Sequence, residues 1–543
     1  MKTKSFALIW IVALSTFLTS LASFAQDSAP RRRHFIFLVH GLNGTVNTFG
    51  ALPEILNELS DKTDPETLTI VKSLDYHTGS SGWTTYDFAY SIGAQIARTV
   101  LAPLPTDRIT LIAHSQGGLI SWIWYITSLQ ATGVHAQGFE QFKPYAQRVE
   151  GLMTLGTPMW GSKLATFAAA FPLFRKGLGD LDIAKLGDKE VQEMSYSSTT
   201  ILRFRRRAVE LDQSESFKVP IRLEAVAGIL PPGAETQLPW IFKWPLNLYE
   251  KYVGSGVGMI TESDIAVAVP SARFDFIYLK PGMETQSSIK AQDFTQFKEK
   301  KLGKLTIVRG PHASVNEKIY DIAEVPAICG NIDNPCAHPT FALIAKFALE
   351  CTPEAVGCRP DEYNRVVDKL MNSKDFTEVK HRKDYIPENM HSFILDIVVT
   401  LPRSFNIEKY KDKVRDFVRF NKTKICPAQK ECQNAVQNAS DPRYYFLVNR
   451  PDERGAVVTN VTDLRMDEPY SALERQMRVT LHGLVYAQTD NPEAYQNMAR
   501  EGFKLPMVIS IPGFPDQKVE ALIKPAYSTF IDLNFGRREP LRN

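Results

Sequence analysis

The sequence predicts an α/β fold with a central, mostly parallel sheet, followed by a β-rich, sandwich-like C-terminal region. Two observations lead to this fold class. Strand-like apolar runs alternate with segments of helical apolar spacing in the first part of the chain, which is typical of parallel strands joined by helical crossovers. From about residue 391, β-branched runs follow one another without helical segments between them, which is typical of a sandwich.

The first predicted strand is His34–Val39, and it leads into the glycine-bearing loop His40–Gly44. Helical spacing follows at Phe49–Leu59 and again at Tyr86–Leu101, with a strand-like run at Thr67–Leu74 between them. The glycines of the first loop fit two interpretations: a tight turn, or a backbone that a ligand approaches closely.

The next predicted strand ends at a serine. Arg108–Ile120 is predicted to form a strand, a sharp turn that contains Ser115, and a helix. Ala113 and Gly117 flank the serine at the spacing of a nucleophile elbow, in which no larger side chain fits and the serine stands clear of the sheet edge. An ordinary turn between strand and helix has the same pattern, so the rest of the chain must supply a base and an acid.

A further strand is predicted at Val149–Leu155, and the loop Gly156–Ser162 follows it at the same sheet edge as Ser115. Residues 163–215 are a lid-like insertion, which forms either a lid over the site or an extra helix on the sheet. Val219–Gly228 is the next buried strand.

A second insertion, residues 231–256, contains an aromatic-rich run. Trp240, Phe242 and Trp244 in this run suit a lipid interface, because exposed aromatic side chains seat at the boundary of a lipid aggregate. Packing of the same side chains in the protein core is the alternative.

Composition and net charge are those of an ordinary globular protein and exclude few classes of function. The chain has 543 residues, of which 44% are hydrophobic and 23% charged, as in ordinary globular proteins of two to four domains. A formal net charge of +3 does not indicate a nucleic-acid partner, and we expect the basic cluster Arg31-Arg32-Arg33 to be a solvated segment.

The N-terminal residues resemble a secretory signal peptide. Lys2 and Lys4 precede an apolar run that ends near Leu21, and small residues at Ser23 and Ala25 suit a signal peptidase. We therefore expect cleavage after Ala25 and an exported protein that is periplasmic, envelope-associated or secreted. An uncleaved N-terminal anchor is the alternative.

Six cysteines agree with an oxidising compartment. They fall into three close couples that are predicted to be disulfides: Cys329 with Cys336, Cys351 with Cys358, and Cys426 with Cys432. Their spacings are not those of a C-x-x-C metal site, so no metal is expected.

Three motifs together resemble a known family. These are Val39-His40-Gly41-Leu42, Ala113-His114-Ser115-Gln116-Gly117-Gly118 and Leu155-Gly156-Thr157-Pro158-Met159-Trp160-Gly161-Ser162. The set is similar to that of the bacterial lipases in the α/β-hydrolase superfamily, and to that of the related serine esterases that deacylate lipid anchors. The resemblance covers roughly residues 34–350 and implies an α/β-hydrolase fold with Ser115 as the nucleophile. It also implies that the backbone N–H groups of Leu42 and Gln116 form the oxyanion hole.

In this superfamily the triad follows the chain order serine, acid, histidine. The segment Gly258–Ala272 resembles the acid-bearing segment of lipases and makes Asp264 the candidate acid, although Ile265 stands where glycine is common; Glu262 is the lesser rival. His312 follows a short predicted strand, Leu305–Val308, and resembles the family's His-x-Ser loop. His338, in a His-Pro pair, is the rival base.

These residues predict an exported serine ester hydrolase that acts on lipid-like esters, on a lipid aggregate or a membrane surface, and that needs no cofactor. A phospholipase or acyltransferase with the same triad is one alternative, and a catalytically silent hydrolase-fold binding protein is another. We expect a catalytic domain at residues 26–351, a helical or linker segment at 352–390 and a β-rich accessory domain at 391–543. The sequence does not identify a protein partner for the accessory domain.

Overall fold

The structure is a computed structural model. It describes residues 32–79, 82–130, 137–162, 164–165, 188–196, 198–213, 221–230, 262–279, 293–313, 321–330, 338–349 and 390–402, and from there 405–406, 409–410, 417–420, 422–425, 433–437, 444–448, 456–457, 475–487, 497 and 499–535. None of the helices in these ranges is long and apolar enough to span a membrane.

The first part of the chain forms a six-stranded sheet in the order β2-β1-β3-β4-β5-β9, and every pair in it is parallel. Its strands are β1 (Arg32–Val39), β2 (Thr67–Leu74), β3 (Arg108–His114), β4 (Val149–Leu155), β5 (Arg222–Ile229) and β9 (Lys304–Arg309). The central strands are apolar because both faces of the sheet are covered. The predicted central parallel sheet is thereby confirmed.

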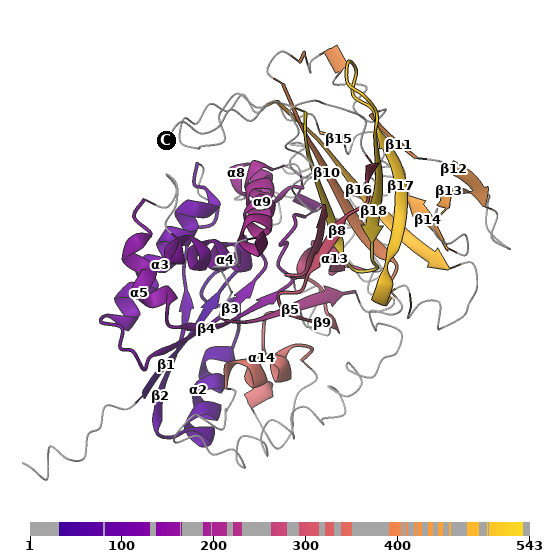
Figure 1. Ribbon diagram of the computed structural model, residues 1–543. Coiled ribbons are helices and arrows are strands. Elements are labelled where there is room, and N and C mark those ends of the chain that lie inside the picture. The colour runs from indigo at the N-terminus through magenta and orange to yellow at the C-terminus, as the bar shows by residue number, and fades with distance from the viewer. Residues whose placement is uncertain are drawn as a thin grey trace, which may run out of the picture.

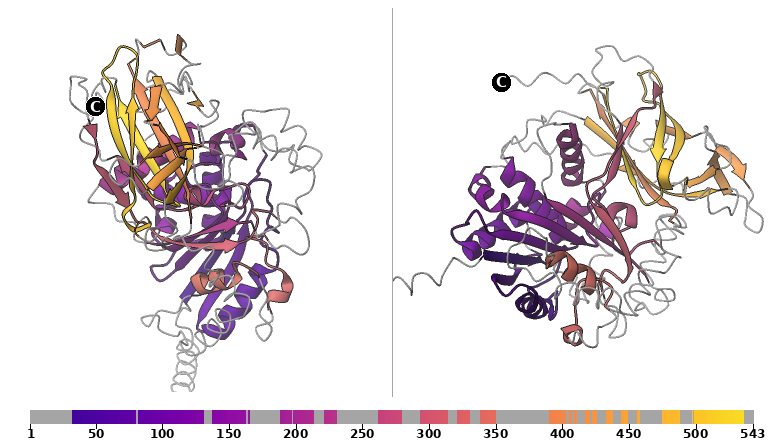
Figure 2. Two further views of the ribbon diagram at one scale, coloured as in Figure 1. Left: turned by 90° about the vertical axis from the view of Figure 1, so that its right-hand side faces the viewer. Right: turned by 60° about the horizontal axis from the view of Figure 1, so that its bottom comes forward.

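Helices cover the two faces of this sheet, as Figures 1 and 2 show. The helices α3 (Thr85–Val100) and α4 (Gln116–Leu129) lie on one face, and α2 (Leu52–Thr63) and α14 (Phe341–Ala348) on the other. Along β1 the side chains alternate between these layers, as the two-residue period of a strand requires. Phe35 and Phe37 pack in the core that includes α3 and α4, whereas Ile36 packs with α2 and α14.

The C-terminal part forms two further sheets. A nine-stranded mixed sheet has the order β12-β13-β14-β16-β10-β19-β6-β8 with β15 on β16, and a four-stranded sheet has the order β11-β17-β18-β7. The strands are β6 (Phe276–Leu279), β7 (Asp293–Phe294), β8 (Phe297–Lys300), β10 (Ser392–Leu401), β11 (Val418–Phe420), β12 (Lys422–Ile425), β13 (Gln433–Gln437), β14 (Tyr444–Val448), β15 (Ala456–Val457), β16 (Arg475–Ala487), β17 (Phe503–Ile509), β18 (Gln517–Ile523) and β19 (Ser528–Asn534). One hydrophobic core joins side chains of both sheets, among them Leu395, Ile397, Leu505 and Ile523. The C-terminal region is therefore β-rich, as predicted.

Three strands from the range predicted for the catalytic domain belong to the C-terminal sheets. Strands β6, β7 and β8 lie before residue 351 and were expected in the catalytic domain, but they pair with the C-terminal sheets. Strand β6 is parallel to β19, and β7 is parallel to β18. Strand β8 joins this sheet through its antiparallel pairing with β6. The partners β19 and β18 lie more than 200 residues from β6 and β7 in the chain, and a local apolar pattern carries no information about such distant partners.

The helices α8 (Asp188–Met194) and α9 (Thr199–Gln213) are the described part of the insertion 163–215. Figure 1 shows α9 between the helices of the six-stranded sheet and strand β10. Ile201 of α9 belongs to the same core as Val398 of β10 and Phe530 of β19. This helix therefore packs between the two parts of the molecule.

Several predictions fall outside the described residues. They concern the leader 1–25, the insertion 231–256 with Trp240, Phe242 and Trp244, nearly all of the segment 352–390, and five of the six cysteines. Cys329 is described and is disulfide-bonded, while its pairing with Cys336 stays a prediction.

Candidate active site

Ser115 lies in the sharp turn between β3 and α4. Its φ is 53° and its ψ is −128°, a conformation that non-glycine residues rarely adopt and that is commonly associated with functional sites. The Ser115 N–H donates to the Leu155 carbonyl at 2.9 Å, which fixes the turn against the end of β4. The strained turn holds the hydroxyl at the carboxyl edge of the sheet.

The glycine two residues later lets the helix approach the neighbouring strand. A Cβ atom on Gly117 would lie 2.3 Å from the His40 carbonyl oxygen and 2.5 Å from that of Val39. No side chain fits in this space, which accounts for the glycine of the A-x-S-x-G pattern.

His312, which follows β9, connects the serine to an acid. Its Nε2 is 2.7 Å from Ser115 Oγ, and its Nδ1 is 2.7 Å from Asp264 Oδ2. The structure therefore brings together three residues that lie as far as 197 positions apart in the chain. In the tautomer that matches these contacts, Nδ1–H donates to the carboxylate and Nε2 accepts from the hydroxyl.

Asp264 is fully buried, and its backbone loop holds it in place. Its Oδ1 accepts the N–H groups of Ala266 at 3.0 Å and Val267 at 2.7 Å, which leaves Oδ2 for His312. Ile265, at the position where lipases commonly have glycine, has a φ of 90°. A β-branched residue is strained at positive φ, so the acid loop adopts this turn with a strained backbone at Ile265.

The surroundings set the charge of the two neighbouring histidines. Burial lowers the pKa of His312, but the Asp264 carboxylate with its hydrogen bond, together with Asp321, outweighs burial and raises that pKa above its ordinary value. Burial, and next the charge of His312, hold the pKa of His114 well below the usual range. The rings of His114 and His312 are 4.8 Å apart, so a neutral imidazole packs beside the one that binds Ser115.

The two residues expected to supply the oxyanion hole belong to the helix start after Ser115 and to the loop after β1, where a Cβ atom on Gly41 would lie 2.6 Å from Ser115 Cβ. Gln116 is the first residue of α4, where a backbone N–H has no partner within the helix. Leu42 follows β1 in the neighbouring loop. Tyr76 braces this loop, because its hydroxyl donates to the His40 carbonyl at 2.7 Å and its ring stacks on that of His40 at 4.4 Å.

Known proteins share this architecture. Residues 35–190 match the family described as the alpha/beta hydrolase fold. This match and the six-stranded parallel sheet show that the first part of the chain has an α/β-hydrolase fold. Phospholipase PlaB from Legionella pneumophila is similar over 93% of this chain and 94% of its own, with 14% sequence identity and a TM-score of 0.53. Because this likeness extends over nearly the whole chain, it includes the C-terminal sheets as well as the parallel sheet.

A second solved structure matches over a shorter part of the chain. It is the mature form of the Bacillus licheniformis lipase BlEst2, with 20% identity over 46% of this chain and 82% of that chain, and a TM-score of 0.29.

The two rival residues, Glu262 and His338, have other partners in this structure. The carboxylate of Glu262 accepts the N–H groups of His391 and Ser392, at 3.0 and 2.7 Å. His338 Nδ1 lies 3.3 Å from the N–H of Thr340, and burial lowers the pKa of His338 to about 4. His312, and not His338, therefore contacts Ser115. Asp264, and not Glu262, contacts His312.

Two residues of the site were missed by the sequence analysis. Tyr76 and His40 contact each other and brace the loop after β1, and in the sequence only their positions just after predicted strands indicated such a role. In the described ranges, no group of three or more His, Cys, Asp or Glu residues is arranged to hold a metal ion.

Gly156 provides a test of the packing around the triad. Its φ is 54°, and a Cβ atom there would lie 2.6 Å from Asp264 Oδ2 and 3.1 Å from His312 Nδ1. We expect Gly156→Ala to lower ester hydrolysis by at least tenfold, because a methyl group at this position displaces the carboxylate, and small displacements cost up to about 100-fold. Gly82→Ala is the matched control, since its φ is also positive but nothing lies within 4 Å of its added Cβ. Equal kcat/KM values for both variants would contradict the expectation.

Proposed function

We propose that the chain is an exported serine hydrolase that cleaves lipid-like carboxylic esters through Ser115, His312 and Asp264. The observation that carries the proposal is the position of the His312 ring, which lies 2.7 Å from both the serine oxygen and the acid oxygen. A serine, a histidine and an acid hydrogen-bonded at these distances form a catalytic triad. In such a triad the histidine accepts the serine proton and the carboxylate stabilises the imidazolium that forms.

The proposed reaction proceeds in two steps. His312 Nε2 takes the proton of Ser115 as the oxygen attacks the ester carbonyl, and the N–H groups of Leu42 and Gln116 bind the oxyanion. His312 then gives the proton to the leaving alcohol, and an acyl group remains on Ser115. Water, activated by the same imidazole, releases the acid. Each oxyanion donor contributes about 2.7–4 kcal/mol to the stabilisation of the transition state.

The architecture and the sequence motifs support lipids as the substrate class. The chain shares its fold with a protein named a phospholipase over nearly its entire length, and its three site motifs resemble those of lipases. A phospholipase is therefore the second candidate. The substrate panel described below distinguishes these hydrolases from an acyltransferase and from a catalytically silent binding protein. The leader-like residues 1–25 support export.

A substrate panel tests this proposal. Purified protein is incubated with acylglycerols of several chain lengths and with vesicles of phosphatidylcholine or phosphatidylglycerol, and released fatty acids are quantified against Ser115→Ala. Release from any of these esters that depends on Ser115 supports the hydrolase, and the preferred panel member identifies lipase or phospholipase. Release that is the same in both proteins, or none from any ester by folded protein, would overturn the proposal.

The base assignment predicts a specific pH dependence. Only neutral His312 can accept the serine proton, and its pKa lies above the ordinary value of about 6.5. We therefore expect kcat/KM to fall as the pH decreases through a value above 6.5.

Alanine substitutions separate the two histidines. His312→Ala should lower kcat by about 10⁴-fold or more, whereas His338→Ala should retain activity in proportion to its folded fraction. Measurements on p-nitrophenyl esters check both, and loss confined to His338→Ala would reverse the assignment.

A further inference from the structure

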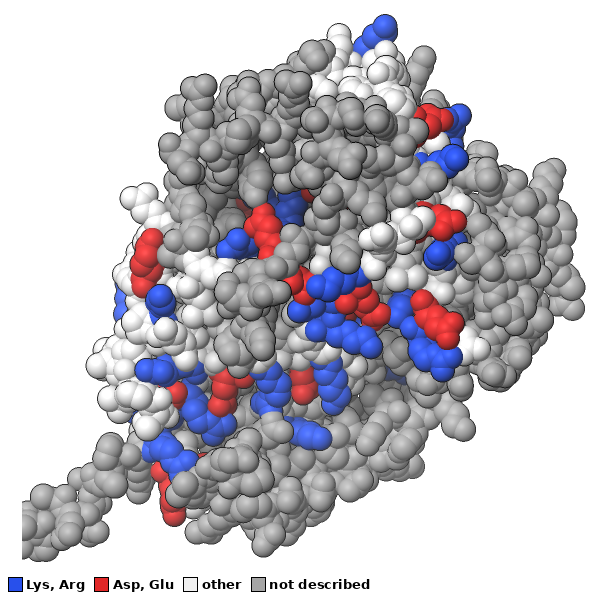
Figure 3. Space-filling model, viewed as in Figure 1, with Lys and Arg blue, Asp and Glu red and all other residues white. Residues whose placement is uncertain are grey.

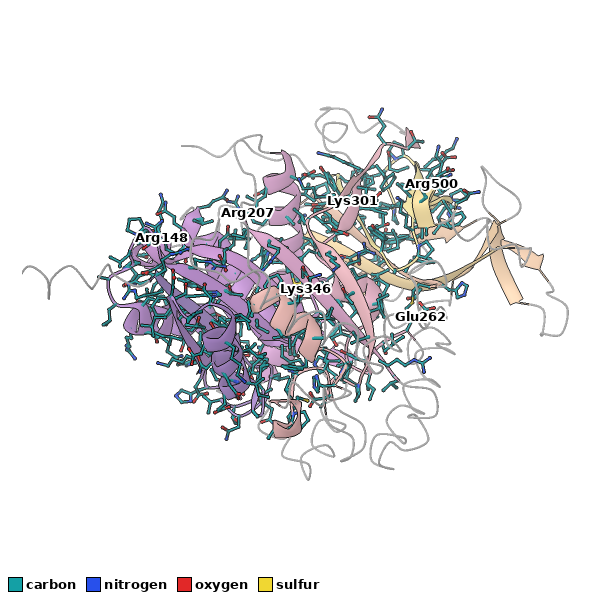
Figure 4. The ribbon with its side chains drawn as sticks, turned by 90° about the horizontal axis from the view of Figure 1, so that it is seen from below. Arg148, Arg207, Glu262, Lys301, Lys346 and Arg500 are labelled. Atoms are coloured by element: carbon teal, nitrogen blue, oxygen red, sulfur yellow. The ribbon has the colours of Figure 1, made fainter. Side chains whose placement is uncertain are left out.

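The loop that carries Asp264 is tied to the C-terminal sheet at its first described residue. Glu262 is buried, and its two carboxylate oxygens accept the N–H groups of His391 and Ser392, where β10 begins. Figure 4 labels Glu262 on the side of the six-stranded sheet that faces the C-terminal strands. The side chain two residues before the acid thus binds a strand that starts 130 positions later.

A second connection runs from β10 to the loop after β4. Asp396 of β10 is fully buried and pairs with Arg205 of α9, which is 1% exposed. Thr480 of β16 donates to the other carboxylate oxygen of Asp396 at 2.7 Å. The Arg205 guanidinium also donates to the carbonyl of Trp160, and it lies 5.6 Å from that indole ring. A residue of the C-terminal sheet therefore orients a guanidinium that holds the loop.

This loop in turn contacts the acid loop. Ser162 Oγ donates to the Ala266 carbonyl at 2.7 Å, and the Ala266 N–H donates to Asp264 Oδ1 at 3.0 Å. The Trp160 indole N–H donates to the Arg273 carbonyl at 2.9 Å, and Ser271 Oγ donates to the Gly161 carbonyl. Strand β10 thus supports the acid from two directions, through Glu262 and through Arg205.

We propose that the nine-stranded C-terminal sheet positions the acid of the triad, with Glu262 as the positioning residue that fixes the Asp264 loop to β10. This inference rests on the proposed function. It assigns the C-terminal sheet a role in forming the site, whereas the sequence left the role of the β-rich accessory domain open.

The physical basis is the irregular backbone of the acid loop. Residues 262–268 form turns and bends, and the orientation of Asp264 depends on two N–H groups of the same loop. Contacts with β10 restrain the start of this segment. Without them, Oδ2 moves relative to His312 Nδ1, and misplacement of about 1 Å costs on the order of 100-fold in rate.

The test compares Glu262→Ala and Glu262→Gln with wild type. The readout is the second-order rate of fluorophosphonate labelling at Ser115 across pH, corrected for the folded fraction. We expect Glu262→Ala to label about 10- to 100-fold more slowly. Glu262→Gln keeps one acceptor oxygen, so its labelling rate should lie between those of Glu262→Ala and wild type.

The pH profile separates positioning from loss of fold. In the part of the chain that the structure describes, the titratable groups Asp264, Asp321 and His114 face His312. A weakened hydrogen bond from His312 to Asp264 removes an influence that raises the His312 pKa. We therefore expect the acid limb of the labelling profile to move to lower pH in Glu262→Ala, an effect that a merely less stable protein does not show.

Asp532→Asn provides the matched control. Asp532 of β19 pairs with Arg206 of α9 at 2.7 Å across the same interface. Arg206 is the residue that follows Arg205 in the chain. We expect this variant to lower the Tm and to leave the labelling rate and the acid limb unchanged. Labelling of Glu262→Ala at the wild-type rate with an unchanged limb, or equal losses in both variants, would overturn the inference. Failure of folded wild type to label at Ser115 would instead overturn the proposed function.

Discussion

Ser115→Ala is expected to lower kcat for p-nitrophenyl ester hydrolysis by about 10⁴- to 10⁶-fold, while the protein remains folded. The loss is large because the serine oxygen is the proposed nucleophile, and the oxyanion donors and substrate binding alone retain only a small part of the rate enhancement. Stability should change little, since alanine at a φ of 53° carries the same backbone strain as serine. Steady-state kinetics with a parallel thermal melt measure both quantities.

Ser128→Ala is the control for this substitution. Ser128 is also buried, and its hydroxyl donates to the Trp124 carbonyl within α4 at 2.6 Å. The substitution therefore removes a buried serine from the helix that follows Ser115 without changing the site. Its kcat should equal that of wild type. Residual activity of Ser115→Ala above about a hundredth of wild type would show that another group performs the chemistry.

Asp396→Ala is expected to reduce the free energy of unfolding by about 3–5 kcal/mol, because it leaves the Arg205 charge buried without its partner. The guanidinium is 1% exposed and has little access to water that could replace the carboxylate. Urea denaturation followed by tryptophan fluorescence measures the change.

Two comparisons sharpen this prediction. Asp516→Ala breaks the exposed pair with Arg419, whose side chains are 53% and 59% exposed, and should cost less than about 1 kcal/mol. The double change Arg205→Met with Asp396→Leu should recover much of the lost stability, since apolar replacement of a buried pair is often neutral. A cost of Asp396→Ala no larger than that of Asp516→Ala would contradict the role given to the pair.

The sequence predicts most of the first sheet because its signals are local. The apolar runs at β1, β3 and β4 are long enough to identify buried strands, and each ends in a glycine-bearing loop. In a parallel sheet these ends share one edge, so Ser115, Asp264 and His312 are expected to meet once their strands are recognised. The structure places them at this edge within hydrogen-bonding distance.

The C-terminal arrangement lacks such signals. Strand β7 has two residues, and its partner β18 lies more than 200 positions away, so nothing in the local pattern identifies the pairing. The pair between Arg205 and Asp396 spans 191 positions. Arg205 is one of four arginines at positions 203–207, and nothing in this run indicates which of them is buried. Figure 3 shows basic and acidic side chains next to one another on the described surface, and their pairing follows from the fold, which the sequence alone does not give.

The most direct test of the account is to map the residue that a fluorophosphonate probe modifies. Intact protein is labelled at pH 8, digested and analysed by peptide mass spectrometry, in parallel with Ser115→Ala and His312→Ala. We predict one adduct, on Ser115, that is absent in Ser115→Ala and forms far more slowly in His312→Ala. Folded wild type that takes no label, or a Ser115→Ala variant that labels as well as wild type, would contradict the assignment of Ser115 as the nucleophile.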